Sequence, residues 1–148
     1  MLIETKYLGE MNINEEKIIF FETGIPGFLD EKEFIILDIP DNDVLQLLQS
    51  LRTPNLAFFI TNPHQFDEAY HFTLTNSVLE TLQITSEKEI VILSIMTINE
   101  PFQASTINLQ APIIINSRRR LGKQVILNDD RYSMKAAIAF SNQAERGE

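Results

Sequence analysis

The sequence predicts a mainly β domain in which an antiparallel sheet curls into a barrel with one or two short helices. Short runs rich in Ile, Phe, Val and Thr recur along the 148 residues, and Gly, Pro, Asn and Asp separate them. No internal repeat at roughly 20–50 residues is present, which argues against a solenoid or a propeller. Closing such a sheet removes the unpaired strand edges that otherwise promote aggregation.

Nine strands are expected, each bounded by turn-forming residues. In chain order they are Ile3–Leu8, Lys17–Glu22, Phe34–Ile39, Leu56–Thr61, Ala69–Leu74, Glu89–Ile98, Ala104–Leu109, Ile113–Asn116 and Gln124–Leu127. Turn residues such as Pro40–Asp43 and Asn62–Pro63 lie between them. The shortness of the strands favours a sheet that turns often and closes on itself.

Two segments depart from the strand pattern and are expected to be short helices. In the first, aliphatic residues recur at i, i+3, i+4 and i+7, namely Val44, Leu47, Leu48 and Leu51. The acidic stretch Asp41–Asp43 offers this helix an N-terminal cap. In the second, Ser77 and Glu80 form an S-x-x-E capping box ahead of Leu82.

The chain is expected to be one domain over residues 1–140, followed by a polar, frayed tail over residues 141–148. It contains no cysteine, which excludes a disulfide framework, a thiolate metal site and a cysteine nucleophile. The N-terminus lacks the pattern of a signal peptide, and the longest apolar runs fall far short of the roughly 20 residues of a membrane helix. These features predict a cytoplasmic protein without a membrane partner.

The charge is negative and unevenly distributed. The formal net charge is −9. Residues 1–100 contain 17 acidic and 5 basic residues, a balance of −12, whereas residues 101–148 contain 4 acidic and 7 basic residues, a balance of +3. A field of this sign repels nucleic acid and anionic lipid. It favours fast docking of a basic protein, although a merely solvated surface would have the same composition.

Residue patterns that carry catalysis are scarce. His64 and His71 lie apart without a third ligand, so no metal site is expected. No G-x-S-x-G nucleophile elbow is present, and no cofactor is indicated. Two alternatives stay open, namely a small hydrolase with a carboxylate pair and an RNA-binding barrel that uses the basic run Arg118–Arg120. Because this run lacks interleaved aromatic residues, a solvated loop or an anchor for an acidic partner is favoured over RNA binding.

The segment Glu89–Ile98 is the most informative strand. Both of its faces are apolar, so each must be covered by other parts of the chain or by a partner. Met96 is flexible and polarizable, which suits an adaptable contact, and Phe102 follows Pro101 in a turn where an exposed ring would anchor a partner. The predicted partner-binding residues are Met96, Ile98, Phe102, Arg118 and Arg119.

The segment Gly24-Ile25-Pro26-Gly27-Phe28 is predicted to form a stiff type II turn. Pro26 fixes its own φ and keeps Ile25 extended, and Gly27 can take the positive φ that position i+2 requires. Phe28 is expected to tuck under the turn and pin it.

A series of short motifs runs in order along residues 3–138. They are Gly24–Phe28, Leu48–Ser50, Pro54–Phe59, Asn62–Pro63, Thr106–Ile113, Asn116, Gln124–Leu127 and Tyr132. No single motif is specific, but the ordered set resembles the FliW family of flagellar assembly factors. One departure is Leu51–Thr53, where the family often has acidic residues, so charge complementarity at that stretch is in question.

The resemblance implies a flattened antiparallel β-barrel that holds no cofactor and is not an enzyme. It also implies two competing partners, flagellin and the translational regulator CsrA, which represses flagellin synthesis. Proteins of this family hold flagellin in the cytoplasm. When flagellin is exported, the freed factor binds CsrA and relieves repression of flagellin mRNA translation, with no direct contact to nucleic acid.

Overall fold

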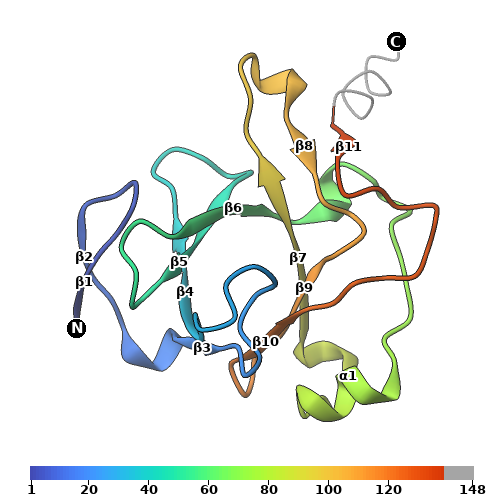
Figure 1. Cartoon of the computed structure of the whole chain (residues 1–148), viewed down its shortest axis with the longest axis horizontal. Coiled ribbons are helices and arrows are strands. Elements are labelled where there is room, and N and C mark those ends of the chain that lie inside the picture. The colour runs from blue at the N-terminus through green and yellow to red at the C-terminus, as the bar shows by residue number, and fades with distance from the viewer. Residues whose placement is uncertain (139–148) are drawn as a thin grey trace.

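The computed structural model describes residues 1–138, most of which lie in or around one curled sheet (Figure 1). The barrel strands are β3 (Ile19–Phe20), β4 (Glu33–Asp38), β5 (Gln46–Ser50), β6 (Ala57–Thr61), β7 (Ile90–Thr97), β9 (Ile113–Asn116) and β10 (Leu121–Gln124). Neighbouring strands follow the order β7-β6-β5-β4-β3-β10-β9, and β9 also pairs with β7. This last pairing closes the seven strands, within residues 1–138, into a barrel.

Smaller elements flank the barrel. The remaining strands are β1 (Leu2–Glu4), β2 (Glu10–Asn12), β8 (Thr106–Ile107) and β11 (Ala136–Ala137). The helical segments are α1 (Asn76–Thr81) and the 3-10 turns η1 (Glu15–Lys17), η2 (Pro63–Gln65), η3 (Glu87–Glu89) and η4 (Phe102–Ala104). β1 and β2 form a separate antiparallel hairpin, whereas β8 and β11 extend the sheet from β7 (Figure 1).

The predicted fold class is confirmed, because the chain forms a mainly antiparallel β-barrel with few helices. One junction differs in direction, since β10 pairs with β3 in parallel through Leu121 and Phe20. The predicted domain boundary after residue 140 and the frayed tail over residues 141–148 lie outside the described residues.

Apolar side chains fill the barrel interior and also cover much of its exterior. The interior cluster consists of Ile19, Phe21, Ile25, Phe34, Leu48, Ile60, Leu93, Ile113 and Ile115. On β7, Leu93 belongs to this cluster, while Met96 packs outside the barrel against Ile107 and Leu109. Both faces of this strand are therefore covered by the chain itself over its central part, from Ile92 to Met96.

The helix predicted around residues 44–51 is wrong, because the segment forms strand β5. Leu48 is buried inside the barrel, and Leu47 is buried on the opposite face against Ile3 and Ile35. Adjacent leucines can both be apolar here because the β1–β2 hairpin covers the outer face of β5. Double-sided burial thus produced a spacing that imitates a helical face.

The predicted strand Ala69–Leu74 is also wrong. The segment has no ladder partner, and Tyr70 instead donates a hydrogen bond from Oη to the carbonyl oxygen of Leu109 at 2.6 Å. Burial raises the pKa of the Tyr70 hydroxyl, which keeps it a donor. The remaining predicted strands exist. Ile113–Asn116 keeps its predicted limits, and the others are shifted, most of all Gln124–Leu127, whose ladder covers Leu121–Gln124.

The helix expected near Ser77 is confirmed as α1, but its cap is a different residue. The side chain of Thr75, rather than Ser77, accepts a hydrogen bond from the backbone N–H of Val78. Val78 and Leu82 then pack against Ile114 on the outside of β9. The helix thereby covers one exterior face of the barrel.

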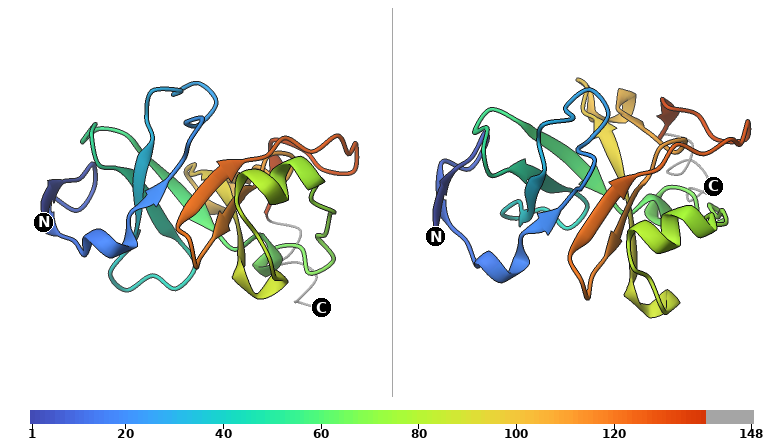
Figure 2. Two further views of the ribbon diagram at one scale, coloured as in Figure 1. Left: turned by 90° about the horizontal axis from the view of Figure 1, so that it is seen from below. Right: turned by 60° about the horizontal axis from the view of Figure 1, so that its bottom comes forward.

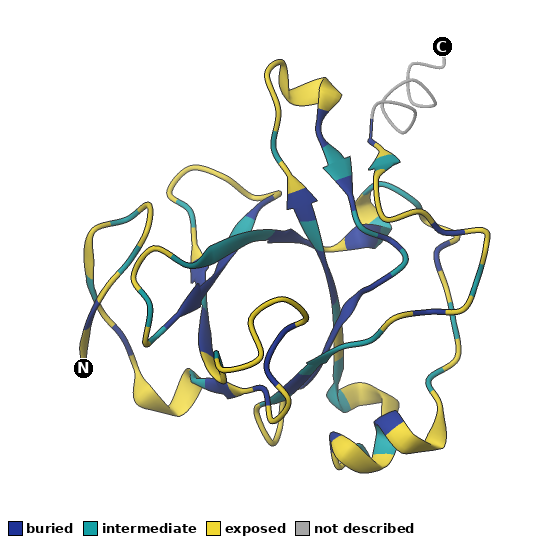
Figure 3. Cartoon of the chain, viewed as in Figure 1, coloured by how far each residue is buried: buried dark blue, intermediate teal, exposed yellow. Residues whose placement is uncertain are grey.

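The Gly24–Phe28 turn lies across one mouth of the barrel (Figure 3). Gly27 has φ +89°, as the turn prediction requires, and Ile25 and Phe28 exchange two backbone hydrogen bonds. The expectation for Phe28 is wrong, since its side chain is 42% exposed and rests on the ring of Phe58. Ile25, at 1% exposure, is the residue that plugs the mouth.

Two buried polar residues, Gln49 and Ser50, fix the loops around this mouth. The Gln49 amide donates to the carbonyl oxygens of Ser50, Pro54 and Leu56 and accepts from the N–H of Lys6. The Ser50 hydroxyl donates to the Glu31 carboxylate at 2.6 Å. Burial raises the pKa of Glu31, but this hydrogen bond and others outweigh it, so the net pKa is lowered.

Replacement of Ser94 by alanine is expected to stabilise the fold by about 1 kcal/mol. Its hydroxyl is fully buried and has no hydrogen-bond partner among residues 1–138, so removing it relieves a desolvation cost. The control is Ser105→Ala, because the buried Ser105 hydroxyl accepts from the N–H of Asn99 at 2.8 Å. Urea unfolding should show that Ser94→Ala is more stable than Ser105→Ala. Equal losses of stability in both variants would contradict this expectation.

Candidate protein-binding surface

The structure distributes the predicted partner-binding residues over opposite ends of β7. Met96 is only 3% exposed and lies in the core, so its side chain is not on the surface. Ile98 is half-buried against the same cluster. Phe102 follows the end of β7, while the arginine run lies beside its beginning, where Ile90 pairs with Asn116. Eight extended residues separate the two ends by about 25 Å, so they do not form one site.

Phe102 occupies the tip of the loop between β7 and β8. Its side chain is 39% exposed. The loop behind it is held by Asn99, whose backbone N–H donates to the Ser105 hydroxyl and whose side chain donates to the carbonyl oxygen of Ala104. Phe102 is therefore an aromatic ring displayed on a hydrogen-bonded loop, as the sequence predicted.

The arginine run forms the tight turn between β9 and β10. Oδ1 of the buried Asn116 accepts from the N–H groups of Arg118 and Arg119, at 3.0 and 3.1 Å. Arg120 closes the turn in the left-handed region, at φ +56°. An L-residue with a Cβ is disfavoured there by about 1–2 kcal/mol relative to the right-handed region.

The second mouth of the barrel is open. The Gly24–Leu29 loop lies at one end, and the turns after β4 and β9 lie at the other (Figure 2, left). Between those turns is a hollow of about 570 Å³. Its floor is aliphatic and is built by four strands, through Ile19, Ile36, Val91 and Ile115. We call this hollow the open mouth.

Charged side chains surround the floor of the open mouth. Lys17, Arg118 and Arg120 line it from the side of β3, β9 and β10. Glu16 also lines it, and Asp38 lines it from β4, where a side-chain oxygen accepts from the Gln46 amide at 2.8 Å. A neighbouring hollow of about 700 Å³ continues past Asp38 along an acidic turn.

Arg119 does not line the open mouth. It lines a separate groove of about 280 Å³ that is bordered by Leu79, Glu80 and Ile84 near α1. The turn therefore divides the run, with Arg118 and Arg120 on the mouth side and Arg119 on the helix side. Such a division does not produce one continuous phosphate-binding strip of three arginines.

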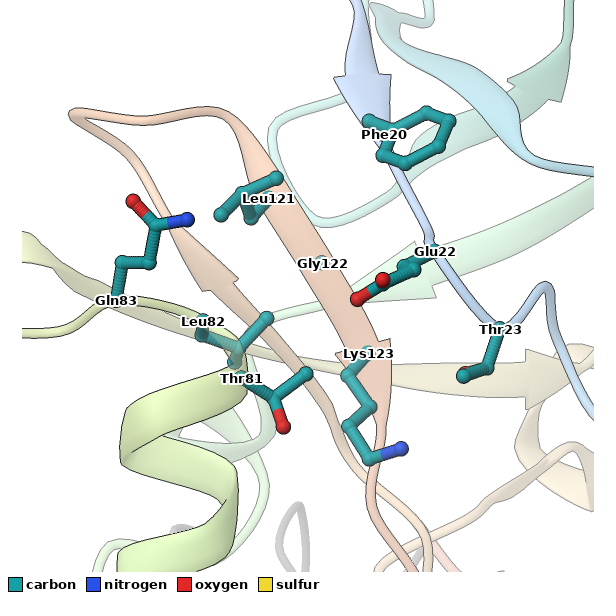
Figure 4. A pocket seen from close by; sticks show the side chains of 9 residues that line it. All are labelled: Phe20, Glu22, Thr23, Thr81, Leu82, Gln83, Leu121, Gly122 and Lys123. Atoms are coloured by element: carbon teal, nitrogen blue, oxygen red, sulfur yellow. The ribbon is translucent and has the colours of Figure 1, made fainter.

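A further groove of about 200 Å³ lies between the end of α1 and strand β10 (Figure 4). Glu22 and Lys123 line it, and its floor is the backbone of Gly122. Gly122 is required there because a Cβ would lie 2.6 Å from Cζ of Phe21. None of the predicted partner-binding residues lines this groove.

The residues of the open mouth include several that sequence reasoning missed. Lys17, Val91 and Arg120 were not singled out as contacts, although Arg120 belonged to the noted run. Little in the sequence indicated this role, because a valine such as Val91 is typical of any strand. Only closure of the barrel places its inward-facing side chain at an open end, where it is 37% exposed.

Residues 1–138 contain no group of three or more His, Cys, Asp or Glu arranged to hold a metal ion. None of the helical segments in that part of the chain has the length and apolar composition of a membrane-spanning helix. Hydrogen bonds from Arg131 lower the pKa of the Asp129 carboxyl to about 2 on the surface.

The fold and its open mouth define a small, closed β-barrel protein that displays a charged opening at one end. The family model described as FliW protein matches residues 2–138. The chain belongs to the FliW family of flagellar assembly factors.

Relatives and a solved structure agree with this assignment. The flagellar assembly factor FliW of Oceanobacillus iheyensis is 51% identical over 138 residues, which cover 93% of this chain and 94% of that protein. The Bacillus subtilis flagellar assembly factor FliW is 46% identical, with 93% and 96% covered. A crystal structure of the flagellar assembly factor FliW superposes with a TM-score of 0.89 at 43% identity, and the match covers 93% of this chain and 96% of that one.

Proposed function

We propose that this chain binds flagellin in the cytoplasm and antagonises the translational regulator CsrA by direct protein binding. Release of CsrA from flagellin mRNA would follow, and repression of flagellin translation would be relieved. The observation that carries the proposal is membership of a family of flagellar assembly factors over residues 2–138. On this view the protein acts through surfaces and transforms no substrate.

The charge of the chain supports this proposal. An mRNA-binding regulator presents basic surface, and residues 1–100 carry a balance of −12. Opposite charge speeds association and favours the correct partner. Exclusive binding of two partners then requires only overlapping surfaces or a coupling between two sites.

The test is to mix the purified chain with flagellin and with CsrA, separately and together, and to weigh the complexes by light scattering. Two binary complexes without a ternary complex are the expected result. Failure to bind either protein would overturn the proposal. A stable ternary complex would overturn exclusive binding alone.

Phe102→Asp is expected to weaken binding of at least one partner by about tenfold or more, because exposed aromatic anchors dominate many interfaces. Its melting temperature should change little, since the ring lies on the surface. Met96→Asp is the contrast, because it buries a carboxylate in the core and should lower stability sharply. Titration calorimetry and thermal unfolding measure the two effects, and full affinity in Phe102→Asp would remove this residue from the surface.

A further inference from the structure

We propose that the open mouth binds an acidic peptide segment of a partner, with one aliphatic side chain of that segment resting on its floor. This inference rests on the proposed function only in that the chain acts by binding proteins. It adds the chemistry that one particular site would recognise.

The floor sets the size of the apolar group that can enter. Ile19 and Ile115 are nearly covered, whereas Val91 is 37% exposed and Ile36 is half-buried. Below them the barrel is solid, because Leu48 is fully buried in the interior cluster. The mouth therefore has room for a side chain but not for a long acyl chain threaded into the barrel.

The cationic side of the mouth sets the charge of the ligand. Within residues 1–138, the side chains of Lys17 and Arg120 make no ion pair, and Arg118 pairs only with Glu89, at 3.6 Å. These cations are concentrated at one point on a chain of net charge −9. Carboxylates on either side of an aliphatic residue would meet them directly.

The remaining rim suits a peptide backbone. Asp38 and Gln46 line the mouth from β4 and β5 and present a carboxylate and an amide carbonyl, and both are acceptors for backbone N–H groups. Glu16 lies next to Lys17 and limits how many carboxylates the cationic side can accept. A short acidic segment with one aliphatic residue would place its carboxylates near the cations and its backbone N–H groups near Asp38 and Gln46.

Arg120 gives an independent reason to expect a role for this turn. A residue with a Cβ is strained at its φ of +56°, and Gly or Asn would be more stable there. Strain of this kind persists where the surrounding structure holds it, and it clusters at functional sites. The strained residue is also one that lines the mouth.

The experiment titrates acetylated, amidated peptides into methyl-labelled protein and follows the methyl signals of Ile36 and Val91 by NMR. The probe is Glu-Glu-Leu-Glu-Glu, with Glu-Glu-Ser-Glu-Glu and Lys-Lys-Leu-Lys-Lys as controls. We expect saturable shifts with the first peptide and binding at least about fivefold weaker with either control. Equal shifts with all three peptides, or none with the probe, would overturn the inference, as would shifts that depend on protein concentration alone and so indicate self-association.

Variants in one turn supply matched controls. Arg120→Asn removes the cation yet suits the left-handed backbone, so it should weaken the probe about threefold to fivefold without loss of thermal stability. Arg119→Gln removes the same charge on the helix side and should leave probe affinity unchanged. Equal weakening by both variants would show a general charge effect and would overturn the proposed site.

The same samples separate this inference from the proposed function. A wild-type chain that binds flagellin or CsrA but not the probe refutes the mouth as an acidic-peptide site and leaves the proposed function standing. A chain that binds the probe at Val91 but neither protein refutes the proposed function and supports the mouth.

Discussion

Replacement of Asn116 by alanine is expected to lower the free energy of unfolding by about 3 kcal/mol. The side chain is fully buried and makes four hydrogen bonds. Its Nδ2 donates to the carbonyl oxygens of Leu82 and Gln83 at the end of α1, and its Oδ1 accepts from Arg118 and Arg119. Alanine would leave the buried Leu82 carbonyl unsatisfied and release the turn beside the open mouth.

Asn108→Ala is the matched control for that loss. The Asn108 side chain also accepts from two backbone N–H groups, those of Gln110 and Ala111, but its amide nitrogen has no partner in the described chain. Asn108→Ala should lower the free energy of unfolding by about 1 kcal/mol. Chemical unfolding followed by circular dichroism measures both variants. Equal losses would mean that the contacts of Asn116 with α1 contribute nothing to stability.

Gly24→Ala is expected to lower the free energy of unfolding by at least about 3 kcal/mol. Gly24 has φ +71°, and an added Cβ would lie 2.7 Å from both Cα and the carbonyl carbon of Leu29. These are backbone atoms, so the clash is relieved only if the loop that closes the first barrel mouth opens. The buried Ile25 would then lose its place in the interior cluster.

Gly27→Ala isolates the strain from the clash. Gly27 lies in the same loop at φ +89°, but a Cβ there would have no atom within 4 Å. Gly27→Ala should therefore lower the free energy of unfolding only through backbone strain, by about 1–2 kcal/mol. Unfolding curves for the two variants give the difference directly. If Gly27→Ala were as damaging as Gly24→Ala, close approach of the loop to itself would not be the cause.

Whether the sequence pattern predicts a segment correctly depends on what covers that segment in the fold. Ile113–Asn116 was predicted with its observed limits, because a run of β-branched residues buried on both faces has few alternatives to a strand. The leucines of β5 were misread because they too are buried on both faces, yet their spacing also fits a helix. Single-sequence periodicity cannot tell these cases apart without knowing what covers the outer face.

The predictions for the candidate surface also succeeded where neighbouring residues decide the outcome and failed where distant segments do. An aromatic residue after a proline in a turn predicted the exposure of Phe102, which is a local property. Met96 was misplaced because the cover over the outer face of β7 comes from β8 and from segments near Leu127 and Tyr132, remote in sequence.

The order of apolar and turn-forming residues was enough to determine the barrel class, the short helix α1 and the Gly27 turn, because propensity and turn chemistry act over a few neighbouring residues. Tertiary structure alone decided which barrel mouth is closed and which is open. It also decided that Arg118 and Arg120 share the open mouth while Arg119 lies in another groove. The reason is that closure of the sheet through β7 and β9 sets the position of every strand end, and no local sequence encodes that pairing.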